Sequence, residues 1–204
     1  MAGRTNIKSL ILAGGKSSRM GTDKSQLVYH GQNSQQIHLA NLCKNVGLEV
    51  YVSKEFGCRE KEIEGFSVMV DRLETFGPIL PIIWAMESDP EAAWLVLACD
   101  LPLWDQQRIE WLVRRRNPNY VATVVQGKER AMPEPLICIY EPSSLPRLKA
   151  YQESGRKSPR KFLLGQMIER VIVEDRYIMN ANTPEERQMA LDQLKSVDED
   201  KESN

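Results

Sequence analysis

The stretch that most constrains the fold is an apolar run without a polar break, AAWLVLAC, at positions 92–99. A strand with one face in water alternates apolar and polar side chains, so this run indicates a strand covered on both faces. Such strands belong to sheets that carry helices on both sides. Asp100 follows the run directly and Pro102 stiffens the turn, which places Asp100 at the carboxyl end of a central strand.

The rest of the chain alternates short apolar runs with amphipathic segments. Strands are predicted at 7–13, 48–53, 66–70, 92–99, 120–126, 135–141 and 170–174, and helices at 34–46, 78–86, 106–116, 143–153, 159–167 and 184–194. This order predicts an α/β fold, a three-layer α/β/α sandwich with a mainly parallel, Rossmann-like sheet. We expect one domain over residues 1–195 and a polar, frayed tail over 196–204.

Composition excludes several classes of protein. The formal net charge of the 204 residues is −1, so no overall field attracts nucleic acid or anionic lipid. The four cysteines form no CxxC pair, which argues against a zinc site and a disulfide framework and for free thiols in a reducing cytoplasm. No apolar run approaches the ~20 residues of a membrane span, and the first residues do not resemble a signal peptide. We expect a cytoplasmic protein without nucleic-acid or membrane partners.

A glycine-rich segment, LILAGGKSSRMGTDK at 10–24, follows the first predicted strand. Gly14, Gly15 and Gly21 allow tight turns whose exposed N–H groups can form an anion-binding nest. The segment also carries three cations, namely Lys16, Arg19 and Lys24. It fits neither G-x-x-x-x-G-K-[ST] nor G-x-G-x-x-G, so it is not one of the familiar phosphate loops. The composition nevertheless favours a polyphosphate ligand.

The segment LAGGKSSRMGTDK at 12–24 resembles the signature L-A-G-G-x-S-x-R-M-G-x-D-K of the molybdenum cofactor guanylyltransferases. Three further segments are similar to motifs of that family in the same order: VDRLETFGPI at 70–79, LACDLP at 97–102 and NANTPEE at 180–186. The resemblance covers nearly the whole chain. It implies a nucleotide-diphospho-sugar transferase type of fold and an enzyme that uses Mg²⁺ to transfer GMP from GTP to the terminal phosphate of molybdenum-bound molybdopterin. It also allows transient contact with other proteins of cofactor assembly.

The resemblance implies roles for particular residues. Nucleotide binding is expected from Leu12, Ala13, Gly14, Gly15, Lys24, Ser53, Asp71 and Asp100. Catalysis is expected from Arg19, Lys24 and Asp100, and metal binding from Asp100 and Asn182, with Asn180 as a further contact. A carboxylate at the sheet edge suits Mg²⁺, and a second carboxylate pairs well with the N–H groups of guanine. The acceptor phosphate, with a second pKa near ~6, is already largely dianionic and needs no general base.

A cluster of cations lies between two predicted helices, and Arg156 and Arg160 are its candidates for binding the pterin substrate. Thr183, Pro184 and Glu186 also form the pattern of a helix start with a capping box. His30 and His38 are assigned no catalytic role, and the four tryptophans are expected mainly in the core.

Several positions depart from the family pattern. Ser53 stands where the family often has Asn, LPIIWAM replaces a small Ala-Gly segment after Pro78, and Glu134 is a substitution before Pro135 and Leu136. The sequence is also compatible with a cytidylyltransferase acting on the same pterin, although such relatives tend to carry L-A-A-G rather than L-A-G-G. It is further compatible with a sugar-phosphate nucleotidyltransferase and with a non-catalytic nucleotide-binding partner in cofactor assembly.

Overall fold

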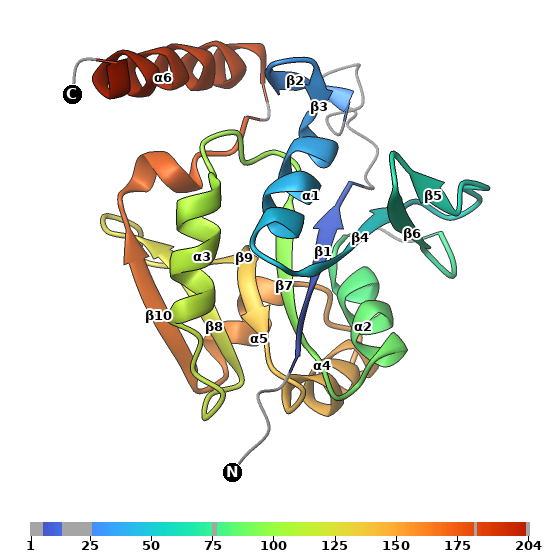
Figure 1. The fold of residues 1–204 in the computed structure, drawn as a ribbon. Helices are drawn as coiled ribbons and strands as arrows, with labels where there is room; N and C mark the ends of the chain where they lie inside the picture. Colours follow the sequence, from blue (N-terminus) through green and yellow to red (C-terminus); the bar gives the residue numbers. More distant parts are fainter. Residues whose placement is uncertain (1–5, 14–25, 75–76, 182, 203–204) are drawn as a thin grey trace.

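The computed structural model describes residues 6–13, 26–74, 77–181 and 183–202, with side chains to residue 195. Its centre is an eight-stranded sheet in the order β10-β8-β9-β7-β1-β4-β6-β5, and β2 and β3 form a separate hairpin (Figure 1). The strands are β1 Ile7–Leu12, β2 Val28–His30, β3 Asn33–Ser34, β4 Glu49–Lys54, β5 Glu62–Ile63, β6 Phe66–Val70, β7 Ala93–Ala98, β8 Ala122–Gly127, β9 Pro133–Tyr140 and β10 Ile168–Val173. The helices are α1 Gln35–Asn45, α2 Ile79–Ser88, α3 Gln106–Arg114, α4 Ser144–Glu153, α5 Pro159–Leu164, the 3-10 helix η2 Asp175–Ile178 and α6 Pro184–Glu202.

Helices cover both faces of the sheet, which confirms the predicted three-layer α/β/α sandwich. Ile11 of β1 packs into one core cluster with residues of α1 and α3, whereas Leu10 and Leu12 pack into a second cluster with residues of α2, α4 and α5. Figure 1 shows α1 and α3 together on one side of the sheet. Every residue of β7 is buried, as the unbroken apolar run predicted.

The sheet is mainly parallel, as predicted. β1 pairs in parallel with β4 and β7, β4 with β6, and β8 with β10. β9 runs antiparallel between β7 and β8, because residues 128–132 are too few for a crossover connection. The antiparallel direction brings the first residues of β9 to the edge where the parallel strands end.

The last helix begins as predicted and continues further. The Glu186 N–H donates to Thr183 Oγ1 at 3.2 Å, and the Thr183 N–H donates to Glu186 Oε2 at 3.1 Å, so the predicted capping box is confirmed. The helix continues past Leu194 to Glu202, into the segment that was expected to fray.

The state of the cysteines agrees with the prediction from the sequence. All four cysteines are free thiols. Within the described ranges, no helix combines the length and the apolar composition that a membrane crossing requires.

Candidate active site

The candidate site lies where the parallel strands β1, β4, β6 and β7 end. Leu12 is in register with Ser53 of β4 on one side and with Ala98 of β7 on the other. Backbone hydrogen bonds continue this alignment beyond the strands, from the Cys99 N–H to the Leu12 carbonyl at 3.3 Å and from the Asp71 N–H to the Lys54 carbonyl at 2.9 Å. Ligands of open α/β sheets bind at this edge, and in Figure 1 the β1 arrow points toward it.

Ser53 and Asp71 form one part of the site. The Ser53 hydroxyl donates to Asp71 Oδ1 at 3.5 Å, and Ser53 is buried while Asp71 is half-buried. Burial raises the pKa of Asp71 to about 6; the Ser53 hydrogen bond lowers this pKa and Glu55 raises it. Asp71 therefore changes charge close to neutral pH, and a ligand that donates hydrogen bonds to it would favour the charged form.

Asp100 follows β7 at the same edge. Its backbone carbonyl accepts from the Ala181 N–H at 3.0 Å, which fixes the segment before α6 against the end of β7. The pKa of Tyr29 is raised to about 12, mainly by burial. Of its charged neighbours, Arg187 lowers this pKa and Asp100 raises it. Asp100 also raises the pKa of Glu134. Tyr29 of β2 and Glu134 of β9 therefore lie within electrostatic range of Asp100, which follows β7.

Glu134 at the start of β9 forms an ion pair with Arg160 of α5. Arg160 Nη2 lies 2.9 Å from Glu134 Oε2, and the exposed fractions of the two side chains are 44% and 8%. Burial raises the pKa of Glu134 above its ordinary value, Arg160 lowers it, and Asp100 raises it again. Glu134 thus interacts electrostatically with both Arg160 and Asp100. Arg156 packs over the Tyr151 ring at 4.9 Å and donates to Ser154 Oγ, so its contacts are with the end of α4 instead.

The oxygen atoms present fit a divalent cation held partly by its substrate. Within the described ranges no group of three or more His, Cys, Asp or Glu could hold a metal ion. Mg²⁺ commonly takes only one or two protein carboxylates together with phosphate oxygens. Asn180 Oδ1 is buried and has no hydrogen-bond partner in the described part of the chain. The N–H of the next residue, Ala181, donates a hydrogen bond to the Asp100 carbonyl. Asp100 and Asn180 are therefore candidate oxygen donors for such an ion.

Several predicted site residues lie outside the described residues, namely Gly14, Gly15, Arg19, Lys24 and Asn182. Their roles stay predictions. Leu12, Ala13, Ser53, Asp71 and Asp100 share the carboxyl edge of the sheet.

Buried polar side chains that the sequence analysis did not identify lie at the same edge. Lys54, 7% exposed, donates from Nζ to Gln36 Oε1 at 2.8 Å, and Gln35 and Gln36 are fully buried at the start of α1. In the sequence, these buried polar residues are indicated only by two adjacent glutamines that precede the apolar positions of a helix.

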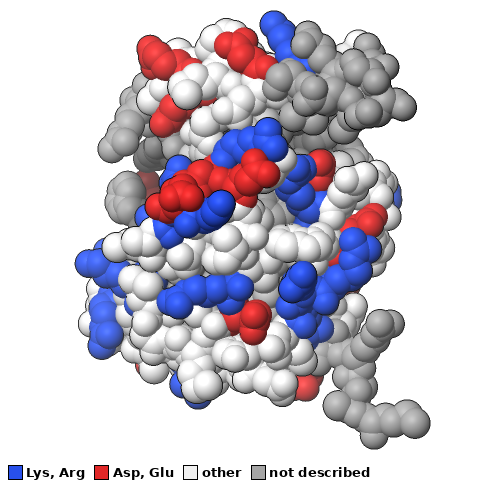
Figure 2. All heavy atoms as spheres, turned by 90° about the vertical axis from the view of Figure 1, so that its left-hand side faces the viewer, with Lys and Arg blue, Asp and Glu red and all other residues white. Residues whose placement is uncertain are grey.

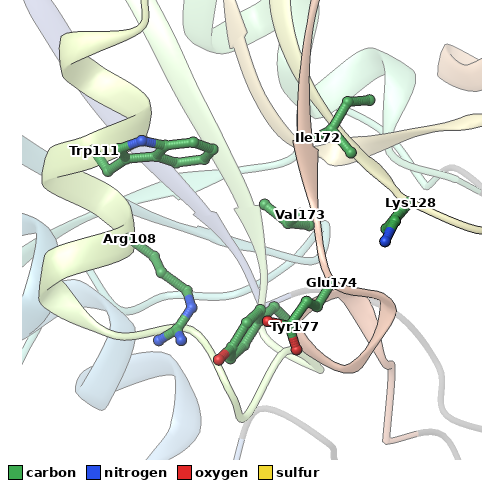
Figure 3. A pocket seen from close by; sticks show the side chains of 7 residues that line it. All are labelled: Arg108, Trp111, Lys128, Ile172, Val173, Glu174 and Tyr177. Carbon is green, nitrogen blue, oxygen red and sulfur yellow. The ribbon is translucent and has the colours of Figure 1, made fainter.

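A separate cavity of about 400 Å³ opens between α3, the end of β10 and η2 (Figure 3). None of the predicted site residues lines it, and its walls include Trp111, Tyr177 and Lys128. The Arg108 guanidinium lies 3.4 Å from the Tyr177 ring centroid and pairs with Asp105. Trp111 is therefore half-buried at a cavity, whereas Trp94 and Trp104 are in the core as predicted. Figure 2 shows Lys and Arg side chains mixed with Asp and Glu on this side of the molecule.

Comparison with known proteins gives consistent matches. The family described as "MobA-like NTP transferase domain" matches residues 9–171. The "Molybdenum cofactor biosynthesis bifunctional protein" of Synechocystis sp. is 35% identical over 90% of this chain and 53% of its own length, so the chain spans about half of that relative. The "Probable molybdenum cofactor guanylyltransferase" of Synechococcus elongatus is 30% identical over 88% of this chain and 95% of its own length.

The fold is also found among solved structures. The crystal structure of molybdopterin-guanine dinucleotide biosynthesis protein A from Archaeoglobus fulgidus matches with a TM-score of 0.72 and 19% identity. The match covers 93% of this chain and 99% of the other, so the two proteins share their fold over almost their full lengths.

Proposed function

Because this chain belongs to the MobA-like NTP transferase family, we propose that it transfers GMP from GTP to the terminal phosphate of molybdopterin and releases pyrophosphate. The observation that carries the proposal is the common position of Ser53, Asp71 and Asp100 at the carboxyl edge of one sheet. The first two residues suit a nucleoside and the third suits the phosphates.

Asp71 is proposed to accept hydrogen bonds from guanine. Its neighbour Ser53 donates to one carboxylate oxygen and leaves the second available to the base. A half-buried carboxylate that meets adjacent N–H donors can discriminate between bases, because a base without those donors leaves the carboxylate unpaired. The main chain at Leu12 and Ala13, with Gly14 and Gly15, is proposed to lie along the nucleoside, and Arg19 and Lys24 along the triphosphate.

Asp100 is proposed to hold Mg²⁺ together with Asn180 and Asn182. Members of this family generally use a divalent metal ion, which supplies charge neutralisation on the phosphates when bound. The buried oxygen of Asn180 and the bond between Ala181 and Asp100 support these donors.

The acceptor is proposed to approach from the side of Arg160. Glu134 holds one nitrogen of this guanidinium, and the 44% exposed side chain keeps further donors for a phosphate. Arg156, whose contacts are with the end of α4, is proposed as a second contact. The acceptor phosphate attacks as a dianion, so the residues of the chain need only align it and offset charge.

The test is pyrophosphate release with GTP or CTP and molybdopterin as acceptor, in the wild type, Asp100→Asn and Asp105→Asn. We expect turnover with GTP that Asp100→Asn lowers by at least about 100-fold, because one carboxylate is lost from the metal site. Asp105→Asn is the matched control, since Asp105 caps α3 and asparagine caps a helix equally well.

A different base, acceptor or role would give a different result in the same assay. Faster turnover with CTP would reassign the base, and turnover only with a sugar 1-phosphate would reassign the acceptor. GTP binding without pyrophosphate release in the wild type would indicate a non-catalytic partner.

A further inference from the structure

Three donors from outside the turn that carries Asp100 bind its carbonyls, and within the turn the Trp104 N–H also donates to the Leu101 carbonyl at 3.4 Å. The carbonyl of Asp100 accepts from the Ala181 N–H at 3.0 Å. The carbonyl of Leu101 accepts from Gln35 Nε2 at 3.1 Å, and the carbonyl of Pro102 lies 2.7 Å from His30 Nε2. Because a carbonyl oxygen only accepts, His30 carries its proton on Nε2. Three successive carbonyls, none of which belongs to a strand or helix, therefore accept hydrogen bonds from residues distant in the sequence.

The two side-chain donors are themselves fixed. Gln35 is fully buried as the first residue of α1, and its N–H donates to the Leu27 carbonyl at 2.7 Å. The His30 ring stacks on the His38 ring of α1, with centroids 3.9 Å apart and planes 10° apart. Burial and, to a smaller extent, the electrostatic effect of His30 lower the pKa of His38 to about 4. The His38 ring is therefore neutral at neutral pH.

We infer that His30 and Gln35 are positioning residues for Asp100, which hold the turn so that the carboxylate meets the metal and phosphates of the nucleotide. This inference rests on the proposed function. The contacts span 72 positions for His30 and 66 for Gln35, so they do not form local structure within the turn.

The arrangement connects two parts of the site. Both side-chain donors lie on the β2–β3–α1 segment, whereas Asp100 follows β7, which is next to β1 in the sheet. A metal ligand has to be held within about 0.5 Å of its productive position by groups that are themselves fixed. The two donors meet that need from a segment whose β2–β3 hairpin Figure 1 shows above the end of β1.

The variants are chosen to separate hydrogen bonding from packing. His30→Leu and Gln35→Met remove each donor at similar volume, and His30→Gln keeps an N–H donor. Gln36→Met is the matched control, because Gln36 is adjacent, equally buried and bonded to Lys54 rather than to the turn.

Three measurements are made on the full chain. These are kcat and KM for GTP, the affinity for Mn²⁺ in the presence of GTP, and hydrogen exchange of the peptide that contains residues 97–104. For His30→Leu and Gln35→Met we expect kcat and Mn²⁺ affinity to fall about 10–100-fold, the range seen when groups that orient metal ligands are removed. KM for GTP should change by less than about threefold, and exchange of the peptide should speed up. His30→Gln should recover most of both losses, and Gln36→Met should keep the wild-type Mn²⁺ affinity.

Other results would overturn the inference. Wild-type kcat and Mn²⁺ affinity in His30→Leu would show that the turn holds Asp100 without this donor. Equal losses in Gln36→Met and Gln35→Met, or no recovery in His30→Gln, would assign the residues to stability alone. If the wild type showed no turnover but its Mn²⁺ affinity were still lowered by His30→Leu, the proposed function would be refuted. The positioning role of His30 would remain.

Discussion

Among single residues, Asp71 gives the clearest pH dependence. Burial raises its pKa from 3.8 to about 6, so the carboxylate is mostly charged at pH 7 and only about one tenth charged at pH 5. If guanine binds the charged form, the Kd for GTP should rise about tenfold from pH 7 to pH 5. Titration calorimetry of the wild type and Asp71→Asn at both pH values measures this Kd. The variant is the reference that corrects for the protonation of GTP itself. Equal pH dependence in both proteins would remove Asp71 from base recognition.

The sequence could identify residues whose position follows from a strand end, but not those that depend on distant contacts. Asp71 and Asp100 follow apolar runs and belong to motifs, so their place at the sheet edge was predictable. His30 was assigned no role, since its bond to the Pro102 carbonyl forms only when β2 folds over the end of β7. Glu134 was noted only as a departure from the family, and its pairing with Arg160 depends on the direction of β9.

Among the elements, α6 begins with a capping box that can be tested directly. Thr183 Oγ1 accepts from the N–H of Glu186, one of the N–H groups that lack a partner inside the helix. Thr183→Ala should therefore lower stability by about 1 kcal/mol, and Thr183→Ser should restore most of it. Urea unfolding followed by circular dichroism measures the difference. If hydrogen exchange in α6 is unchanged in Thr183→Ala, the cap does not contribute to the stability of this helix.

The elements that the sequence predicted are those with a strong apolar pattern. The strand at 92–99 was predicted because its apolar run is unbroken, and α1 and α3 were predicted because their apolar residues recur at helical spacing. The β2–β3 hairpin and β5 were missed, because two or three residues carry no periodicity. The direction of β9 is a property of its short connection rather than of its own residues.

At the scale of the whole molecule, the three-layer architecture follows from the pattern, whereas the links between layers do not. Arg116, just after α3, and Glu141, just after β9, form a two-point pair, with Nε to Oε1 at 2.7 Å and Nη2 to Oε2 at 2.6 Å. Their side chains are 11% and 2% exposed, so this ion pair joins a helix layer to the sheet almost out of contact with water. The positions of an arginine and a glutamate 25 residues apart gave no hint of it.

This buried pair predicts a non-additive effect on global stability. Arg116→Met should lower the free energy of unfolding by about 3–5 kcal/mol, because it leaves the Glu141 carboxylate buried without this partner. The double variant Arg116→Met/Glu141→Leu should recover most of that loss, since apolar side chains of similar volume often replace a buried ion pair at little cost. Urea unfolding of the wild type, both single variants and the double variant gives the coupling energy. Additive losses would mean that the two side chains stabilise the fold independently, and that the helix layer is held to the sheet by apolar packing alone.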